Sequence, residues 1–140
     1  MTKERNFWDE EVETLPLERL KKLQLERLQE LASRVYEKTP FYRHRFDEAG
    51  VKPSDIKTLD DIRKLPITED DDTRGKPITD KLGVPEDEIK VFSSTTGTTT
   101  GIPEPLAYNM NDIDLFFTGE VRAKWAIGVR PYDVVQIMTR

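Results

Sequence analysis

Hydrophobic residues recur at helical spacing between Pro16 and Lys38, and charged residues fill most of the opposite side. The pattern predicts an amphipathic helix that packs on a globular body, with self-dimerisation through this helix as the alternative. Thr39-Pro40 ends the helix, because a proline ring disfavours the helical conformation in the residue before it. The apolar stripe consists of Leu17, Leu20, Leu28, Leu31, Ala32 and Val35.

The next segments predict short elements. Residues 41–50 form a short helix closed by Gly50, since glycine accepts the left-handed conformation of a helix C-terminus. Residues 53–56 and 58–62 predict successive turns, the second with Thr58 as N-cap and Asp61 at the capping-box position. Adjacent carboxylates at residues 69–72 point in different directions, so they predict a solvated N-terminal turn rather than a metal site.

The last third of the chain is more apolar. Two strand-like segments, residues 89–92 and 105–108, flank a polar loop. A helix follows from the capping pair Asn111-Asp112 to about Ile127, with apolar residues over most of its circumference, and such a helix is normally buried on several sides. Residues 134–138 predict a strand of the continuous apolar kind found in buried parallel sheets.

A buried helix and a sheet-core strand need partners on both faces, yet only two short strand candidates precede them. The sequence is therefore expected to be the front end of a larger, apparently truncated α/β protein. We expect a helical N-terminal region over residues 1–90. Residues 91–140 would hold a hairpin, a buried helix and the first sheet strand of an incomplete domain.

The composition argues against several classes of protein and of binding site. With 140 residues and a net charge of −5, the chain lacks the basic surface that nucleic-acid phosphates require. It has no cysteine and a single histidine, His44, so neither a thiolate site nor a histidine-based zinc centre is expected. No apolar run approaches the roughly 20 residues that span a bilayer, and no apolar leader is present. We expect a cytoplasmic protein without a membrane partner.

The loop Ser93–Pro103 carries the candidate chemistry. Glycines allow backbone N–H groups to turn toward an anion, and neighbouring hydroxyls add donors, so the segment predicts a phosphate-binding loop. A solvated Ser/Thr linker is the alternative. A Walker loop is not expected, because only three residues separate Gly97 from Gly101 and no lysine follows before Lys124. The candidate phosphate-binding residues are Ser93, Ser94, Thr96, Gly97, Thr98, Thr99, Thr100 and Gly101; no residue is assigned a catalytic or metal-binding role.

Motifs along nearly the whole chain resemble the N-terminal part of the phenylacetate-CoA ligase family, within the adenylate-forming superfamily. They occur in order and are Leu23-Gln24-x-x-Arg27-Leu28, Val35-Tyr36-Glu37-x-x-Pro40-Phe41-Tyr42-Arg43, Phe46-Asp47-Glu48-Ala49-Gly50-Val51, Leu59-Asp60-Asp61-Ile62-x-Lys64-Leu65-Pro66, the hydroxyl-rich loop, and Gly128-Val129-Arg130-Pro131-x-Asp133-Val134-Val135-Gln136. The resemblance implies the start of the large N-terminal domain of such an enzyme.

The family loop reads Ser-Ser-Gly-Thr-Thr-Gly-x-Pro. Here Gly97-Thr98-Thr99 and Gly101-Ile102-Pro103 match it with Thr100 inserted, and Glu104 stands where many members have a lysine or a small residue.

The resemblance implies a two-step reaction. A carboxylic acid and ATP form an acyl-adenylate and pyrophosphate, and the acyl group then passes to coenzyme A. The loop would steady the β and γ phosphates together with Mg²⁺. Thr98 and Thr99 would be hydroxyl donors, Gly97 and Gly101 would allow close backbone approach, and the remaining hydroxyls would make secondary contacts.

The resemblance places the acyl pocket, the adenosine contacts and the lysine of the small C-terminal domain beyond Arg140, so the chain alone is expected to be inactive. Two alternatives stay open. One is a related adenylating enzyme such as a coenzyme F390 synthetase, which acts on a deazaflavin. The other is a non-enzymatic interaction module with a regulatory Ser/Thr loop. A homodimer is also compatible with the sequence.

Overall fold

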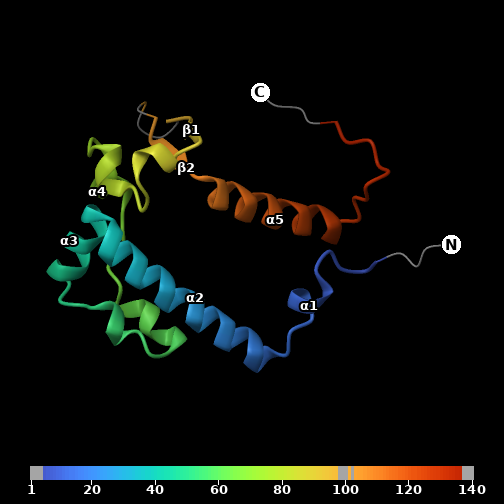
Figure 1. The fold of residues 1–140 in the computed structure, drawn as a ribbon, viewed down its shortest axis with the longest axis horizontal. Helices are drawn as coiled ribbons and strands as arrows, with labels where there is room; N and C mark the ends of the chain where they lie inside the picture. The colour runs from blue at the N-terminus through green and yellow to red at the C-terminus, as the bar shows by residue number, and fades with distance from the viewer. Residues whose placement is uncertain (1–4, 98–100, 102, 137–140) are drawn as a thin grey trace. The chain divides into compact units, whose positions relative to one another are not determined.

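The computed structural model describes residues 5–97, 101 and 103–136 of the chain. These residues belong to two compact units, Pro16–Met110 on the one hand and Met1–Leu15 with Asn111–Arg140 on the other. Figure 1 labels the helices and strands. The chain order is α1 (Glu10–Glu13), α2 (Leu17–Lys38), α3 (Pro40–Glu48), the 3-10 helices η1 (Pro53–Asp55) and η2 (Leu59–Lys64), α4 (Asp70–Thr73), η3 (Ile78–Lys81) and η4 (Glu86–Glu88), β1 (Val91–Ser94), β2 (Pro105–Tyr108) and α5 (Met110–Ala126).

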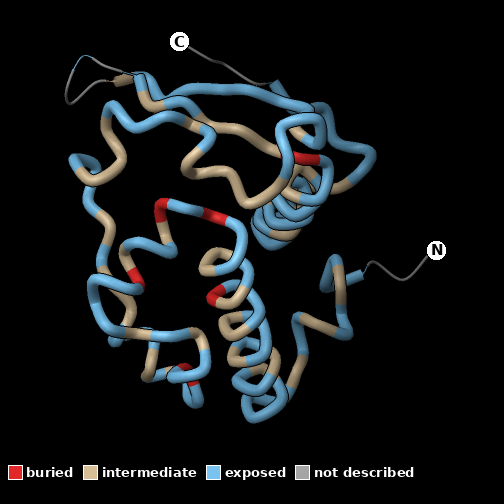
Figure 2. Tube along the Cα trace, turned by 60° about the vertical axis from the view of Figure 1, so that its left-hand side comes forward, coloured by how far each residue is buried: buried red, intermediate tan, exposed pale blue. Residues whose placement is uncertain are grey.

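The core of the Pro16–Met110 unit lies where α2, α3 and the residue after η1 meet. Ala32, Phe46 and Ile56 are at most 3% exposed and form one cluster. In Figure 2 the buried positions, in red, are few and most of the trace is exposed. The half-buried residues packed against the cluster are Leu25, Leu28, Val35, Tyr36 and Leu65.

The predicted amphipathic helix is confirmed as α2, but its packed stripe is narrower than the sequence indicates. Leu28, Ala32 and Val35 belong to the core, whereas Leu17 and Leu31 are 63% and 48% exposed. The packed positions are one helical turn apart, so they follow a single line along the helix, and Leu17 and Leu31 lie off that line or before it begins. Helical spacing alone could not show where the partner surface ends.

The connection from α2 to α3 follows the sequence prediction. Thr39 ends α2 in an extended conformation and Pro40 occupies the first position of α3, where its missing N–H costs nothing. Arg43 donates hydrogen bonds to the backbone oxygens of Tyr36 at 2.8 Å and Glu37 at 2.7 Å, which otherwise lack helical partners at the end of α2. Gly50, at φ +66°, closes α3 as predicted.

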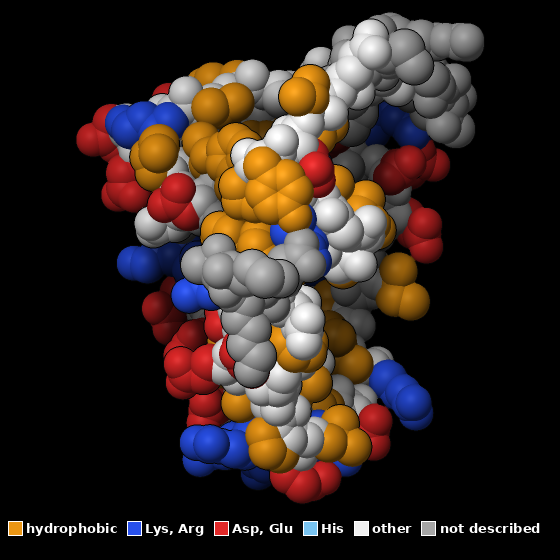
Figure 3. Space-filling model, turned by 90° about the vertical axis from the view of Figure 1, so that its right-hand side faces the viewer, with side chains coloured by type: hydrophobic (Ala, Val, Ile, Leu, Met, Phe, Trp, Pro, Cys, Tyr) orange, Lys and Arg blue, Asp and Glu red, His pale blue; other side chains and the backbone are white. Residues whose placement is uncertain are grey.

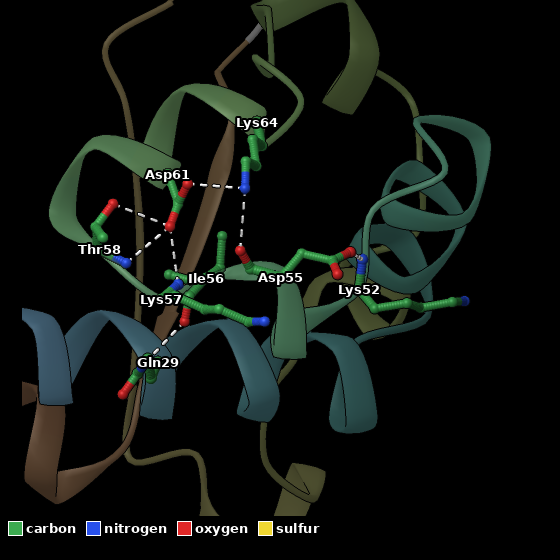
Figure 4. Close-up of polar contacts among 8 residues, drawn as sticks. All are labelled: Gln29, Lys52, Asp55, Ile56, Lys57, Thr58, Asp61 and Lys64. Carbon is green, nitrogen blue, oxygen red and sulfur yellow. Dashed lines mark hydrogen bonds and ion pairs between the residues drawn. The ribbon is translucent and has the colours of Figure 1, made fainter.

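The predicted capping box at η2 is present (Figure 4). Asp61 Oδ2 accepts hydrogen bonds from the backbone N–H groups of Lys57 at 2.9 Å and Thr58 at 2.7 Å, and Lys64 Nζ lies 2.8 Å from Asp61 Oδ1. The bond to Lys64 and the two backbone N–H groups hold the pKa of the Asp61 carboxyl well below its usual range. Gln29 on α2 donates to the Ile56 carbonyl at 2.7 Å, which ties this turn to the core.

The acidic run begins α4. The backbone N–H of Glu69 donates to Asp72 Oδ2 at 2.9 Å, and Arg45 on α3 lies 3.0 Å from the same carboxylate. Within the described part of the chain, no group of three or more His, Cys, Asp or Glu side chains could hold a metal ion. The run therefore has the capping role that adjacent acidic residues favour at a helix start.

Helix α5 confirms the predicted late helix but begins at Met110, so the prediction of Asn111-Asp112 as its cap is wrong. None of its residues is buried; Leu115, Phe116 and Phe117 are 69%, 62% and 59% exposed. Figure 3 shows hydrophobic side chains, in orange, at the surface. The expectation that α5 is buried on several sides is therefore not met within the described residues.

The other end of α5 is covered by the N-terminal segment, which the sequence analysis did not predict. The Trp125 ring lies 5.6 Å from the Trp8 ring and 4.4 Å from the Arg130 guanidinium, and its Nε1 donates to the Arg5 carbonyl at 3.2 Å. Arg122 pairs with Asp9 at 3.1 Å. Trp8 and Trp125 are more than one hundred positions apart in the chain, and no local sequence pattern indicates a contact between two such distant rings.

The predicted strand at residues 134–138 is not found in its described part. Residues 134–136 are in neither a helix nor a strand, and Val134 is fully exposed at 101%. Ile137 and Met138 lie outside the described residues. A parallel strand is stable only beside a hydrogen-bonded neighbour, and none of the described segments pairs with residues 134–136. Separately, no helix in the described ranges has the length and apolar character to cross a membrane.

We predict that Ile56→Ala lowers the free energy of unfolding by about 3 kcal/mol, because the truncation leaves a cavity between α2 and α3. Urea unfolding measures the change. Ile67→Ala is the matched control, since the Ile67 side chain is 78% exposed and its loss is expected to change the value by less than about 0.5 kcal/mol. Equal effects of the two substitutions would contradict this core.

We predict that the stabilising effect of Asp61 depends on pH. Its pKa in the folded chain lies below the usual value of 3.8, so its contribution is complete above that value and is lost as the pH falls through the lowered pKa. The difference in unfolding free energy between the wild type and Asp61→Asn should be constant above about pH 5 and shrink toward low pH. A difference between the wild type and Asp61→Asn that is the same at all pH values would refute the assignment.

Candidate phosphate-binding hairpin

The candidate loop is held at both ends by a two-stranded antiparallel hairpin, as the flanking apolar segments predict. Strands β1 and β2 pair Val91 with Tyr108 and Ser94 with Pro105, and the Lys90 N–H donates to the Tyr108 carbonyl at 2.9 Å. The first strand begins two residues later than expected and includes the first two hydroxyl residues of the loop. Pro105 is tolerated because a two-stranded hairpin leaves one side of each strand free of ladder bonds.

Two residues outside the candidate set close the base of the loop. The Thr95 N–H donates to the Glu104 carbonyl at 3.0 Å, and the Glu104 N–H donates to Thr95 Oγ1 at 2.9 Å. This reciprocal pair continues the ladder by one step beyond Ser94 and Pro105 and fixes the separation of the two loop ends. The sequence analysis noted Glu104 only as a departure from the family loop and gave Thr95 no role, although a hairpin with strands of equal length places the two residues opposite one another.

Both glycines of the loop adopt positive φ, +66° at Gly97 and +74° at Gly101. Side-chain-bearing residues rarely adopt this conformation, so it explains why glycine is needed at these positions. A Cβ on Gly101 would meet no atom within 4 Å. Glycine is therefore needed at this position for its backbone conformation and not for lack of space. The Gly101 N–H donates to the Gly97 carbonyl at 2.6 Å and is therefore already engaged within the loop.

The hydroxyl residues of the described part are open to solvent. Ser93, Ser94 and Thr96 are exposed. Successive residues of a strand point to opposite faces, so Ser93 and Ser94 cannot both turn the same way from β1. Thr98, Thr99 and Thr100 lie outside the described residues, and their role as phosphate ligands stays a prediction.

Glu104 connects the loop to the helical part of the same unit. Its carboxylate forms an ion pair with Lys81 of η3. The hydrogen bond from Lys81 is the main cause that lowers the pKa of the Glu104 carboxyl, and the Thr73 hydroxyl and the charge of Arg74 act in the same direction. No sequence pattern pointed to Lys81, because it lies 23 residues from its partner on a separate element.

Comparison with known proteins identifies the class. No protein-family model matches the chain. It is 40% identical over 125 residues to a phenylacetate-coenzyme A ligase of Thermus thermophilus, covering 89% of this chain and 28% of that enzyme. A phenylacetate-coenzyme A ligase of Escherichia coli is 36% identical over 126 residues, covering 90% of this chain and 29% of the enzyme.

Solved structures agree with this result. A 2-hydroxyisobutyryl-CoA ligase, solved with 2-HIB-AMP and CoA, superposes with a TM-score of 0.83 at 32% identity, covering 92% of this chain and 28% of the ligase. The fold of the chain is therefore that of a part of the adenylate-forming CoA ligases. Within that class, the chain is homologous to the phenylacetate-CoA ligases, and it spans about 28% of their length, consistent with an N-terminal portion.

We predict that Gly101→Ala loosens the hairpin, because alanine at positive φ costs about 1 kcal/mol. Amide hydrogen exchange at Lys90 and Thr95, whose N–H groups bridge the strands, should become about fivefold faster. Gly119→Ala is the control: Gly119 lies in α5 with open space around it, and the substitution should leave both exchange rates unchanged. Unchanged rates in Gly101→Ala would contradict the role of this glycine.

Proposed function

We propose that this segment binds the pyrophosphate part of ATP in an ATP-dependent acid–CoA ligase of the phenylacetate-CoA ligase type. The observation that supports the proposal best is a hydroxyl-rich loop anchored between two strands, within a region that is 34–40% identical to phenylacetate-CoA ligases. In this proposal residues 1–90 form a helical region, and residues 91–140 contribute to an adenylation domain.

The loop would act on the departing pyrophosphate. When ATP is bound, its triphosphate supplies the leaving group for acyl-adenylate formation. Hydroxyls of Thr98 and Thr99 would donate to phosphate oxygens, and the positive φ at Gly97 allows the backbone to approach them closely. Because the N–H of Gly101 is engaged by Gly97, Gly101 would serve to hold the turn rather than to donate. Ser93 or Ser94, Thr96 and Thr100 would make secondary contacts.

Mg²⁺ would be held mainly by the phosphates. The described residues contain no set of three carboxylate or histidine ligands, and Glu104, the carboxylate at the base of the loop, is paired with Lys81. Magnesium bound through phosphate oxygens and water fits such a site, because this ion keeps several of its waters. The chain's own contribution is then to fix the phosphates.

The remaining parts of the proposal follow from the whole ligases. Coenzyme A and a carboxylic acid would be the other substrates, in a cytoplasmic enzyme where ATP and coenzyme A are available. A homodimer is a further expectation. The structural relative acts on 2-hydroxyisobutyrate and the sequence relatives on phenylacetate, so both acids belong in any test of substrate.

The test is acid-dependent exchange of labelled pyrophosphate into ATP by the natural gene product. We expect exchange with one or more members of a panel containing phenylacetate, 2-hydroxyisobutyrate, benzoate and a deazaflavin. Thr98→Val and Thr99→Val should each reduce the exchange rate roughly tenfold or more, because each removes a donor to the leaving group.

Thr118→Val is the matched control for these substitutions. The Thr118 hydroxyl donates to the Asp114 carbonyl within α5, and its loss should leave exchange unchanged. Exchange that does not depend on any acid, or that is insensitive to both loop substitutions, would count against the proposal.

A further inference from the structure

A carboxylate at the base of a phosphate-binding loop presents an electrostatic problem. Glu104 lies one position from the last loop residue, Pro103, and its backbone forms both hydrogen bonds that close the loop at Thr95. Its position is therefore fixed relative to the loop ends. A free negative charge at this position would repel a polyphosphate, which carries several negative charges of its own.

The structure places a cation directly on this carboxylate. Lys81 of η3 forms the ion pair with Glu104, with side chains 15% and 32% exposed. Arg74, just after α4, adds positive charge near the same group. At this degree of exposure water and salt screen the pair only in part, so removing either partner leaves an uncompensated charge that still acts on its surroundings.

From this arrangement we infer that Lys81 neutralises the Glu104 carboxylate so that the base of the loop accepts a polyphosphate. This inference rests on the proposed function of the loop. Lys81 is a positioning residue in this account: it acts on the ligand through Glu104 and need not touch a phosphate. If the ion pair served only to hold η3 against the base of the loop, substituting either Lys81 or Glu104 would weaken the loop structure and lower the affinity for polyphosphate.

The experiment measures tripolyphosphate binding to the natural gene product by isothermal titration calorimetry. Lys81→Met should weaken binding about five- to tenfold, because it leaves the Glu104 charge uncompensated. Glu104→Gln should tighten binding by a similar factor, because it leaves the Lys81 charge free. The double substitution should restore the wild-type affinity. The differences between variants should shrink as salt is raised.

Lys64→Met is the control for loss of an ion pair as such. Lys64 lies 2.8 Å from Asp61 on η2, and its substitution should not change tripolyphosphate affinity. Melting temperatures of all variants show whether each one folds, and Lys81→Arg, which keeps the charge, should bind as the wild type does.

The outcomes separate the inference from the proposed function. If the wild type binds tripolyphosphate but Lys81→Met binds equally well, or Glu104→Gln weakens binding, the electrostatic role of Lys81 is refuted and the loop function stands. If the double substitution stays as weak as Lys81→Met, Lys81 acts by another route and the inference is again refuted. If the folded wild type does not bind tripolyphosphate, both are refuted.

Discussion

Burial of Ile56 against Ala32 and Phe46 is the interaction on which the Pro16–Met110 unit depends. It holds α3 and the turn after η1 on the long helix α2, and further contacts lead from this core to the loop. Arg45 on α3 binds the Asp72 carboxylate and the Ile67 carbonyl at the start of α4. The end of α4 and η3 then supply Thr73 and Lys81 to Glu104, at the base of the candidate loop. The loop is thus anchored on a packed body although most of its own residues are exposed.

Local signals in the sequence predicted the elements that local chemistry determines. The helical spacing of apolar residues predicted α2, and the Thr39-Pro40 pair predicted where it ends. The Thr58 and Asp61 side chains predicted the capping box of η2. These predictions succeeded because each depends on residues within a few positions of one another. The glycines of the loop were also predictable, because a positive φ leaves few other choices.

Predictions that depended on distant partners failed or were not possible. The strand expected from Val134 onward requires a neighbouring strand, which the described chain does not supply, and the Trp8–Trp125 contact joins the two ends of the sequence. No sequence pattern around Lys81 indicates that it pairs with Glu104. The exposed Leu115, Phe116 and Phe117 of α5 agree with a chain that spans about 28% of its relatives' length. An apolar helix face of this kind is normally covered in a folded protein.

The central claim is that the loop between β1 and β2 binds the phosphates of ATP. A crystal structure of the natural gene product with ATP or an acyl-adenylate and pyrophosphate tests it most directly. The account predicts β and γ phosphate oxygens within about 3 Å of hydroxyl or backbone N–H groups between Thr95 and Glu104. It also predicts that the Lys81–Glu104 ion pair is intact beneath them. Phosphates bound elsewhere, with this loop free of ligand, would contradict the account.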